Sequence, residues 1–142
     1  MFLESKDFKK HLVENISVHK SLVNNSGVLY QVIKLFSNKL KNGNSIFICG
    51  NGGSASDAEH LSTEFLVRLR PKINRKPFKI INLGMNIPYI TACANDYSFQ
   101  NVFSRSLEAI SKPNDVLWVI STSGNSKNII KALNKAKKLK IK

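Results

Sequence analysis

Two side chains of one predicted helix have the types that hold a metal ion or move a proton. His60 and Glu64 are four residues apart, so they project from the same face of a helix. An imidazole and a carboxylate at this spacing supply two zinc ligands or an acid/base pair. An ordinary helix pair on a solvated face is the alternative. His11 and His19 have no spacing to His60 that completes a metal site, so the pair suggests such a centre without completing it.

A loop rich in hydroxyl groups is the second candidate site. Ser121, Thr122, Ser123 and Ser126 fall within six residues, beside Gly124 and directly before a predicted helix. Hydroxyl and backbone N–H groups in such a loop can bind the three oxygens of a phosphate without a buried cation. A polar turn whose last serine only caps the helix is the alternative. One loop of this kind suits a phosphate monoester better than a pyrophosphate.

A glycine loop at 50–53 follows an apolar run at 46–49 and opens the helix that carries His60. Such a loop lets the backbone approach an anion closely. Ser54 and Asp57 have the spacing of a capping box. The loop also matches the dinucleotide pattern, but no acid ends the second strand and no Walker lysine follows the glycines, which disfavours NAD and nucleoside triphosphates. A tight turn without a ligand is the alternative.

The elements that must position these groups alternate along the chain. Apolar spacing predicts two helices that form an antiparallel hairpin over 1–42, with excess apolar surface that suggests contact with another subunit. Strands are predicted at 46–49, 78–83 and 116–120, and helical segments from 54, at 89–94, at 99–110 and after 126. The last of these helices is expected to bury Ile129, Ile130, Leu133 and Ala136.

Apolar strands that alternate with helices and lack period-two alternation indicate a parallel sheet covered on both faces. The predicted fold class is therefore α/β, with three α/β/α layers. Ligands of such sheets bind outside the carboxyl ends of the strands. The exit loops at 50–54, 84–88 and 121–126 are expected to converge on one crevice.

Length and charge narrow the function further. The 142 residues predict one domain, and no apolar run has membrane-spanning length. The N-terminus lacks the order of a signal peptide, so a cytoplasmic protein with no membrane partner is predicted. The net charge is +13, and seven lysines lie within 127–142 without interleaved aromatics, which argues against nucleic acid as a partner. Cys49 and Cys93 are interpreted as core thiols.

The glycine loop, the pair in the following helix, Asn95 with Asp96 and the serine loop, in this order, resemble a sugar isomerase (SIS) domain of the phosphoheptose isomerase type. The resemblance covers nearly the whole chain. It implies a flavodoxin-like sheet over 45–142, N-terminal helices at 1–42 used in oligomerisation, and a cytoplasmic homotetramer. It also implies isomerisation of sedoheptulose 7-phosphate to D-glycero-D-manno-heptose 7-phosphate, an aldose-ketose step in heptose synthesis for lipopolysaccharide or capsule.

The resemblance assigns roles residue by residue. It implies one Zn2+ per subunit, bound by His60 and Glu64, with Glu64 also an acid/base residue. The implied contacts to the phosphorylated sugar are Asn51, Gly52, Gly53, Ser54, Glu64, Asn95, Asp96, Ser121, Thr122, Ser123 and Ser126. For Asn95 and Asp96, capping of the next helix is the alternative.

The family takes its remaining metal ligands from a C-terminal helix that these 142 residues lack. Residues 140–142 resemble a chain that leaves a helix for a fourth strand, so we expect a truncated domain that is inactive alone. The second hypothesis is a non-catalytic SIS protein that binds phosphosugars, either associated with the replication initiator or regulatory. Such proteins keep the serine loop but can lose the metal pair, and retention of His60 and Glu64 favours the enzyme.

Overall fold

A fully buried strand, β1 (Ile46–Gly50), forms the centre of the sheet in the computed structural model, which describes residues 5–84 and 86–142. It pairs in parallel with β2 (Ile80–Asn82) on one side and with β3 (Val116–Ile120) on the other, in the order β2-β1-β3. Ile46 lies opposite Ile80 and Val116. The predicted parallel sheet is confirmed.

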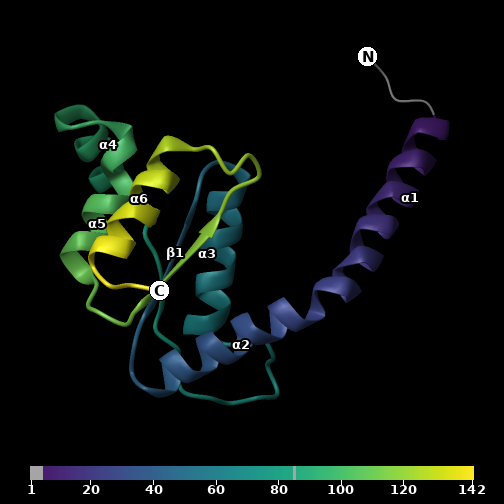
Figure 1. Cartoon of the computed structure of the whole chain (residues 1–142), viewed down its shortest axis with the longest axis horizontal. Coiled ribbons are helices and arrows are strands. Elements are labelled where there is room, and N and C mark those ends of the chain that lie inside the picture. Colours follow the sequence, from purple (N-terminus) through teal and green to yellow (C-terminus); the bar gives the residue numbers. More distant parts are fainter. Residues whose placement is uncertain (1–4, 85) are drawn as a thin grey trace. The chain divides into compact units, whose positions relative to one another are not determined.

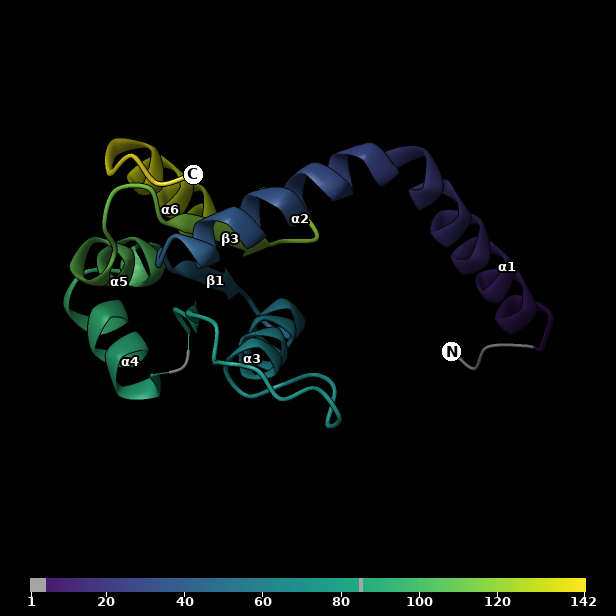
Figure 2. The ribbon, with the colours of Figure 1, turned by 90° about the horizontal axis from the view of Figure 1, so that it is seen from below.

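Helices cover both faces of this sheet, as Figures 1 and 2 show for the helices beside β1. One face packs against α3 (Gly53–Leu66) and against Phe36 and Leu40 of α2 (Ser26–Lys41). The other face packs against α4 (Ile87–Asp96), α5 (Val102–Ile110) and α6 (Lys127–Lys138), with the 3₁₀ helix η2 (Phe99–Asn101) before α5. The predicted three layers are confirmed.

The strand predictions differ from the structure mainly at β2. The residues at 78 and 79 precede the paired segment, so this strand is shorter than the predicted 78–83. The predicted helical piece at 89–94 is part of α4, whose start is capped by the Asn86 side chain, which accepts the N–H of Tyr89. Met85 of the predicted exit loop and residues 1–4 lie outside the described residues.

The N-terminal segment consists of α1 (Ser5–Ser21), the 3₁₀ helix η1 (Leu22–Asn25) and α2. The chain divides into two compact units at residues 35 and 36. Ser21 and Ser26, which flank η1, both have right-handed helical dihedral angles. A chain reversal needs non-helical angles, so the antiparallel hairpin is wrong: the segment continues from helix to helix through a 3₁₀ turn.

The buried face of the last helix was predicted in part, since Ile129 and Ala136 are buried as expected. Asn128, Ile129, Ala132 and Ala136 are its buried residues, whereas Ile130 and Leu133 are exposed. The buried side therefore starts with a polar amide.

After α6, the last residue of the chain lies beside the start of β3. The N–H of Lys142 donates to the carbonyl of Asp115 at 2.9 Å, and the N–H of Leu117 donates to the carbonyl of Lys142 at 2.8 Å. These two bonds have the alternation of a parallel ladder.

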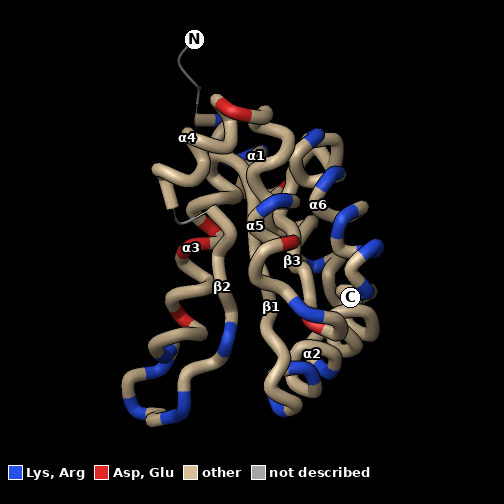
Figure 3. The backbone as a smooth tube through the Cα atoms, turned by 90° about the vertical axis from the view of Figure 1, so that its left-hand side faces the viewer, with Lys and Arg blue, Asp and Glu red and all other residues tan. Residues whose placement is uncertain are grey.

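Basic residues are concentrated on two segments of the chain. Figure 3 shows lysines along α6 and basic residues on the loop that follows α3. Lys135 of α6 forms an ion pair with Glu108 of α5 at 2.8 Å, which lowers the pKa of that carboxyl group. None of the described helices combines the length and apolar character that crossing a bilayer requires.

Candidate functional site

The strand order places a crevice at the carboxyl ends of β1 and β3. The chain passes from β1 through α3 on one face of the sheet, and from β3 into α6 on the other face. Neighbouring strands whose following helices lie on opposite faces create the switch point at which ligands of open α/β sheets bind. The glycine loop and the serine loop therefore flank one crevice.

The glycine loop is tight because it has almost no side chains. A Cβ atom at Gly50 would lie 2.4 Å from the carbonyl oxygen of Ser54, so any larger residue collides with the first turn of α3. Gly52 has φ +55°, a conformation that L side chains rarely adopt. These two glycines bring the end of β1 directly onto the start of α3.

The predicted capping box at the start of α3 is wrong. The helix starts at Gly53 with Gly52 in the N-cap position and no side-chain cap. Ser54 is therefore already within the first turn, where its N–H donates to the carbonyl of Asn51 at 3.0 Å. Its hydroxyl group is left to face the crevice.

The serine loop is held by its own hydroxyl oxygens. The Ser121 Oγ accepts the N–H of Gly124 at 3.1 Å, and the Ser123 Oγ accepts the N–H of Asn125 at 3.2 Å. Each hydroxyl retains its hydrogen as a donor. Ser126 is the N-cap residue of α6, but its side chain makes no capping hydrogen bond. The alternative of a merely capping serine thus has no support in this geometry.

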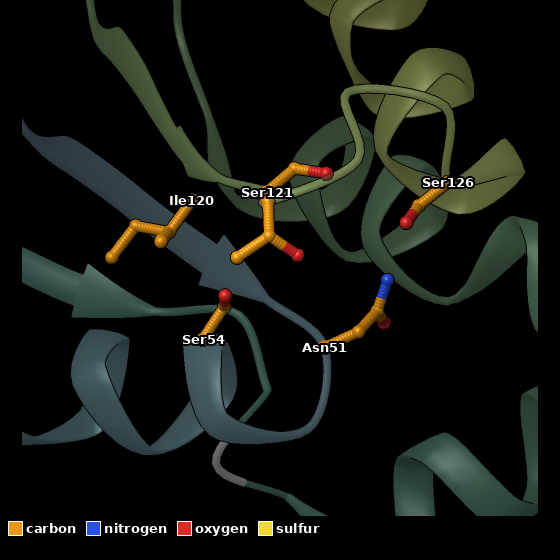
Figure 4. Close-up of a pocket in the computed structure, with 6 residues that line it drawn as sticks. Asn51, Ser54, Ile120, Ser121 and Ser126 are labelled. Atoms are coloured by element: carbon orange, nitrogen blue, oxygen red, sulfur yellow. The ribbon is translucent and has the colours of Figure 1, made fainter. Parts of the chain in front are cut away.

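The two loops enclose a polar cavity of about 50 Å³. Figure 4 shows side chains from the glycine loop, the start of α3, the end of β3 and the serine loop around this space. Such a volume has room for about four water-sized groups. The lining residues are Asn51, Ser54, Ile120, Ser121, Thr122 and Ser126. The cavity thus offers hydroxyl and amide donors to a small anion.

The metal-type pair lines a different cavity, further along α3. The His60 Nε2 and the Glu64 Oε1 are 3.9 Å apart, and their side chains are 72% and 27% exposed. This second cavity has a volume of about 420 Å³, and Leu61, Phe65 and Trp118 contribute apolar walls. No cluster of three or more His, Cys, Asp or Glu side chains suited to a metal lies within 5–84 and 86–142.

The two cavities share one side of the sheet. Trp118 lines the second cavity and Ile120 the first, and residues two apart in a strand lie on the same face. The expected single crevice is therefore divided into two cavities along α3.

The remaining predicted sugar contacts, Gly52, Gly53, Asn95 and Asp96, do not line these two cavities. Gly52 lines a third cavity of about 130 Å³ with Gly84, at the exit of β2. Gly53 is the first residue of α3 and is exposed. Asn95 and Asp96 end α4, where the Asn95 amide donates to the Asp96 carboxylate at 2.9 Å. They do not cap the helix that follows, and their proposed role in sugar binding stays a prediction.

Both thiols are buried, as predicted. Burial raises the pKa of Cys49 to about 12, because the thiolate would lose its hydration at the end of β1. This thiol therefore stays protonated beside the glycine loop.

One residue of the crevice was not identified from the sequence. Asn128, in the first turn of α6, exchanges two hydrogen bonds with the side chain of Asn51. The sequence offered one indication of its role. Asn128 lies two residues after Ser126, and it is a polar residue at the first buried position of the helix.

Comparison with known proteins agrees with this geometry. A family model described as SIS domain matches residues 13–142. The phosphoheptose isomerase of Helicobacter pylori (strain ATCC 700392 / 26695) is 46% identical over 134 residues, which are 94% of this chain and 69% of that protein. That of Crocosphaera subtropica is 47% identical over 111 residues, 78% of this chain and 56% of that protein.

Solved structures give the same relation. A phosphoheptose isomerase from Francisella tularensis has a TM-score of 0.90 and 31% identity over 99% of this chain and 73% of its own. Phosphoheptose isomerase GmhA from Neisseria gonorrhoeae has a TM-score of 0.81 and 33% identity over 96% of this chain and 68% of its own. With its SIS domain and this similarity over most of its length, the chain belongs to the phosphoheptose isomerase family.

Proposed function

We propose that the protein containing this chain is a phosphoheptose isomerase that converts sedoheptulose 7-phosphate to D-glycero-D-manno-heptose 7-phosphate. The chain spans between 56% and 69% of the length of the two curated relatives described above, so the activity is proposed for the complete protein. The observation that carries the proposal is the cavity of hydroxyl and amide donors between the β1 and β3 exits.

The phosphate end of the substrate is assigned to this cavity. The hydrogens of Ser121 and Ser126 are available as donors, because the Ser121 oxygen accepts a loop N–H and the Ser126 side chain does not cap α6. Ser54 and Thr122 add two more hydroxyls. Ser123, whose oxygen also accepts a loop N–H, is proposed as a further donor. Neutral donors at the start of two helices suit a phosphate dianion.

The isomerisation itself is assigned to Glu64. Conversion between ketose and aldose moves a proton between adjacent carbons, so a base must lie beside the carbon acid. The Glu64 side chain is half-buried and lies on the same side of the sheet as the phosphate cavity. We assign it the abstraction and return of this proton. Gly52, Gly53, Asn95 and Asp96 are assigned to the sugar hydroxyls, and Asn51, which lines the phosphate cavity, to both the sugar and the phosphate.

A zinc ion is proposed beside this base. An imidazole and a carboxylate on one helix face fit two of the four ligands that zinc takes, and His60 and Glu64 are such a pair. The other ligands are expected from outside the described residues. When bound, the ion would supply positive charge next to the oxyanion that develops on the sugar.

Self-association through the N-terminal helices is part of the same proposal, with a homotetramer as the expected particle. None of the α1 and α2 residues is buried in the described chain. Large apolar side chains such as Phe8, Ile16, Val23 and Ile33 are more than half exposed there. An apolar surface of this extent is typical of a protein interface. We also propose that the protein acts in the cytoplasm.

A second candidate function is supported by the lining of the phosphate cavity, which does not include His60 or Glu64. A non-catalytic SIS protein that binds a phosphosugar needs this cavity and no base. The two functions differ in turnover, not in phosphate binding.

The deciding experiment is an assay of the protein from the complete reading frame with sedoheptulose 7-phosphate, with and without a chelator. Formation of the heptose 7-phosphate that the chelator suppresses would support the isomerase. Binding of the substrate without any product would favour the phosphosugar-binding protein.

A further inference from the structure

A pair of asparagine amides bridges the crevice between the two loops. The Asn51 Nδ2 donates to the Asn128 Oδ1 at 3.0 Å, and the Asn128 Nδ2 donates to the Asn51 Oδ1 at 2.8 Å. Asn51 follows β1 and Asn128 lies in the first turn of α6, 77 residues later. The bridge therefore joins the two segments that diverge toward opposite faces of the sheet.

The orientation of both amides is determined by the backbone of α6. The Asn128 Oδ1 also accepts the N–H of Ile129 at 3.0 Å. A backbone N–H can only donate, so this side-chain atom must be the oxygen and the Asn51 atom facing it must be the nitrogen. The start of α6 thus dictates which way the Asn51 amide points.

Burial makes this arrangement hard to replace. Asn128 is 3% exposed and heads the buried side of α6 beside Ile129. A buried amide is costly unless its polar atoms are paired. Its oxygen is paired with Asn51 and Ile129, and its nitrogen with Asn51. The side chain is therefore held in one rotamer by partners on two elements.

The amide of Asn51 retains one donor for a ligand. A primary amide nitrogen carries two hydrogens, and the reciprocal pair uses one of them. Asn51 also lines the polar cavity, and Figure 4 shows its amide nitrogen turned toward Ser126. The second hydrogen is accordingly available at the wall of the cavity assigned to the phosphate.

We propose that Asn128 is a positioning residue of the phosphate-binding cavity. It orients the Asn51 amide toward the anion and sets the distance between the glycine loop and the start of α6. Asn128 itself does not line the cavity, so it acts through Asn51. This inference rests on the proposed function only in its assignment of the cavity to a phosphate.

The test uses Asn51→Ala, Asn128→Ala and the double variant in the protein from the complete reading frame. The measurements are the affinity for inorganic phosphate, from thermal shift titrations, and KM and kcat for sedoheptulose 7-phosphate. Hydrogen bonds to charged groups imply a loss of about 10- to 100-fold in phosphate affinity for each single variant. We expect KM to rise by a similar factor, whereas kcat changes by about threefold or less.

The double variant separates positioning from independent effects. If Asn128 acts through Asn51, the double variant binds phosphate about as weakly as Asn51→Ala alone, whereas independent contributions would multiply. Asn128→Asp is the second variant in case the alanine does not fold. It keeps the volume and the bond from Ile129 but has no hydrogen for Asn51. Combining it with Asn51→Ala distinguishes lost positioning from direct repulsion of phosphate, because repulsion alone would persist in the double variant.

Asn101→Ala is the matched control. Its amide donates to the Ser98 Oγ at 2.7 Å, outside the cavity, so its loss should leave phosphate affinity and KM unchanged. Phosphate affinity within twofold of wild type in Asn128→Ala and Asn128→Asp would overturn the inference. So would multiplicative losses in the double variants, or no phosphate binding by the wild type. A wild type that binds phosphate but forms no product would overturn the proposed isomerase and leave the role of Asn128 intact.

Discussion

The two ends of the proposed active site are built differently. The phosphate end combines groups from the β1 exit, the β3 exit and the starts of α3 and α6. The β1 exit and the start of α6 are joined by the Asn51–Asn128 pair within one chain. The isomerisation end consists of two side chains from one helix, and the imidazole of His60 is 72% exposed.

This difference separates binding from chemistry. Two loops are sufficient to surround a phosphate with donors, because every helix start has free backbone N–H groups and the residues around it often include Ser or Thr. A metal with an acid/base group needs ligands from several elements, and α3 supplies two of them. The described residues thus line the proposed anion cavity and supply two groups of the proposed reaction centre, and each substitution below should affect one end more than the other.

The largest effect is expected from Glu64→Gln, which acts on the isomerisation end alone. An amide cannot accept the substrate proton, and a positioned base contributes about 10²- to 10⁴-fold to rate. We expect turnover of sedoheptulose 7-phosphate to fall by about 10³-fold. The affinity for inorganic phosphate should stay within twofold, because Glu64 lines the other cavity. Steady-state kinetics and thermal shift titrations measure the two quantities.

Glu59→Gln is the control for this substitution. Glu59 is an exposed residue of the same helix and lines neither cavity. It should retain wild-type turnover. Turnover within fivefold of wild type in Glu64→Gln would remove Glu64 from the mechanism and favour the phosphosugar-binding alternative.

Gly50→Ala should damage the phosphate end by displacing α3. The added Cβ would lie 2.4 Å from the Ser54 carbonyl oxygen, a backbone atom that cannot move without the helix. Overpacking of this kind costs about 1–3 kcal/mol of stability. We expect a shift of this size in the free energy of unfolding, measured by urea titration, together with weaker phosphate binding.

Gly27→Ala is the matched control, because a Cβ there meets nothing within 4 Å in α2. It should be neutral or raise stability by up to about 1 kcal/mol, since alanine has a higher helix propensity than glycine. Equal stability of the two variants would show that the close approach of β1 to α3 is not required.

The order of elements and the sheet could be predicted from the sequence, because buried helices and strands each leave a recognisable pattern of apolar residues. The uninterrupted apolar runs of β1 and β3 indicated a parallel sheet, and both strands lie within one residue of the prediction. The hairpin was wrong for a physical reason: the polar residues at 24–26 resemble a turn, but a 3₁₀ helix accommodates them as well. Local composition at this point does not decide between reversal and continuation.

The residues that line the polar cavity could be predicted better than the contacts between them. The hydroxyls were identified from their density, yet the capping box of Ser54 failed because the N-cap position is taken by Gly52, two residues before the serine. The Asn51–Asn128 pair joins residues 77 apart, a contact that only the folded sheet creates. The spacing of residues along the sequence indicates which side chains are neighbours on one element. It does not indicate which residues meet across the crevice.

Ser126→Ala should affect phosphate binding without an effect on stability. An N-cap serine normally contributes about 1 kcal/mol through its side chain, but Ser126 makes no capping bond. Its hydroxyl is therefore free for the anion, and its loss should weaken phosphate binding by about tenfold. Thermal shift titrations give both quantities. A lower melting temperature with unchanged phosphate affinity would mean that the serine caps α6 after all.

Ser111→Ala is the control, because its hydroxyl donates to the carbonyl of Leu107 outside the site. It should show the opposite pattern, lower stability with intact phosphate affinity.

The smallest effect is expected at the far end of α3, where Arg75 holds the helix terminus beside Glu64. Its guanidinium donates to the carbonyls of Glu64 at 2.6 Å and Phe65 at 2.8 Å and stacks on the ring of Phe78 at 4.6 Å. Lysine lacks the planar fork that reaches two carbonyls at once. Arg75→Lys should lower stability by about 1 kcal/mol and kcat a few fold, because one of two such bonds is lost.

This substitution sharpens the contrast between the two ends, because it perturbs the base through its backbone and touches no phosphate donor. Phosphate affinity should therefore be unchanged while kcat falls, the reverse of the pattern expected for Ser126→Ala. Arg70→Lys, an exposed arginine of the same loop, should change neither quantity. A loss of phosphate affinity in Arg75→Lys would mean that the two cavities along α3 respond as one site, and that the division between binding and chemistry is not maintained in the enzyme.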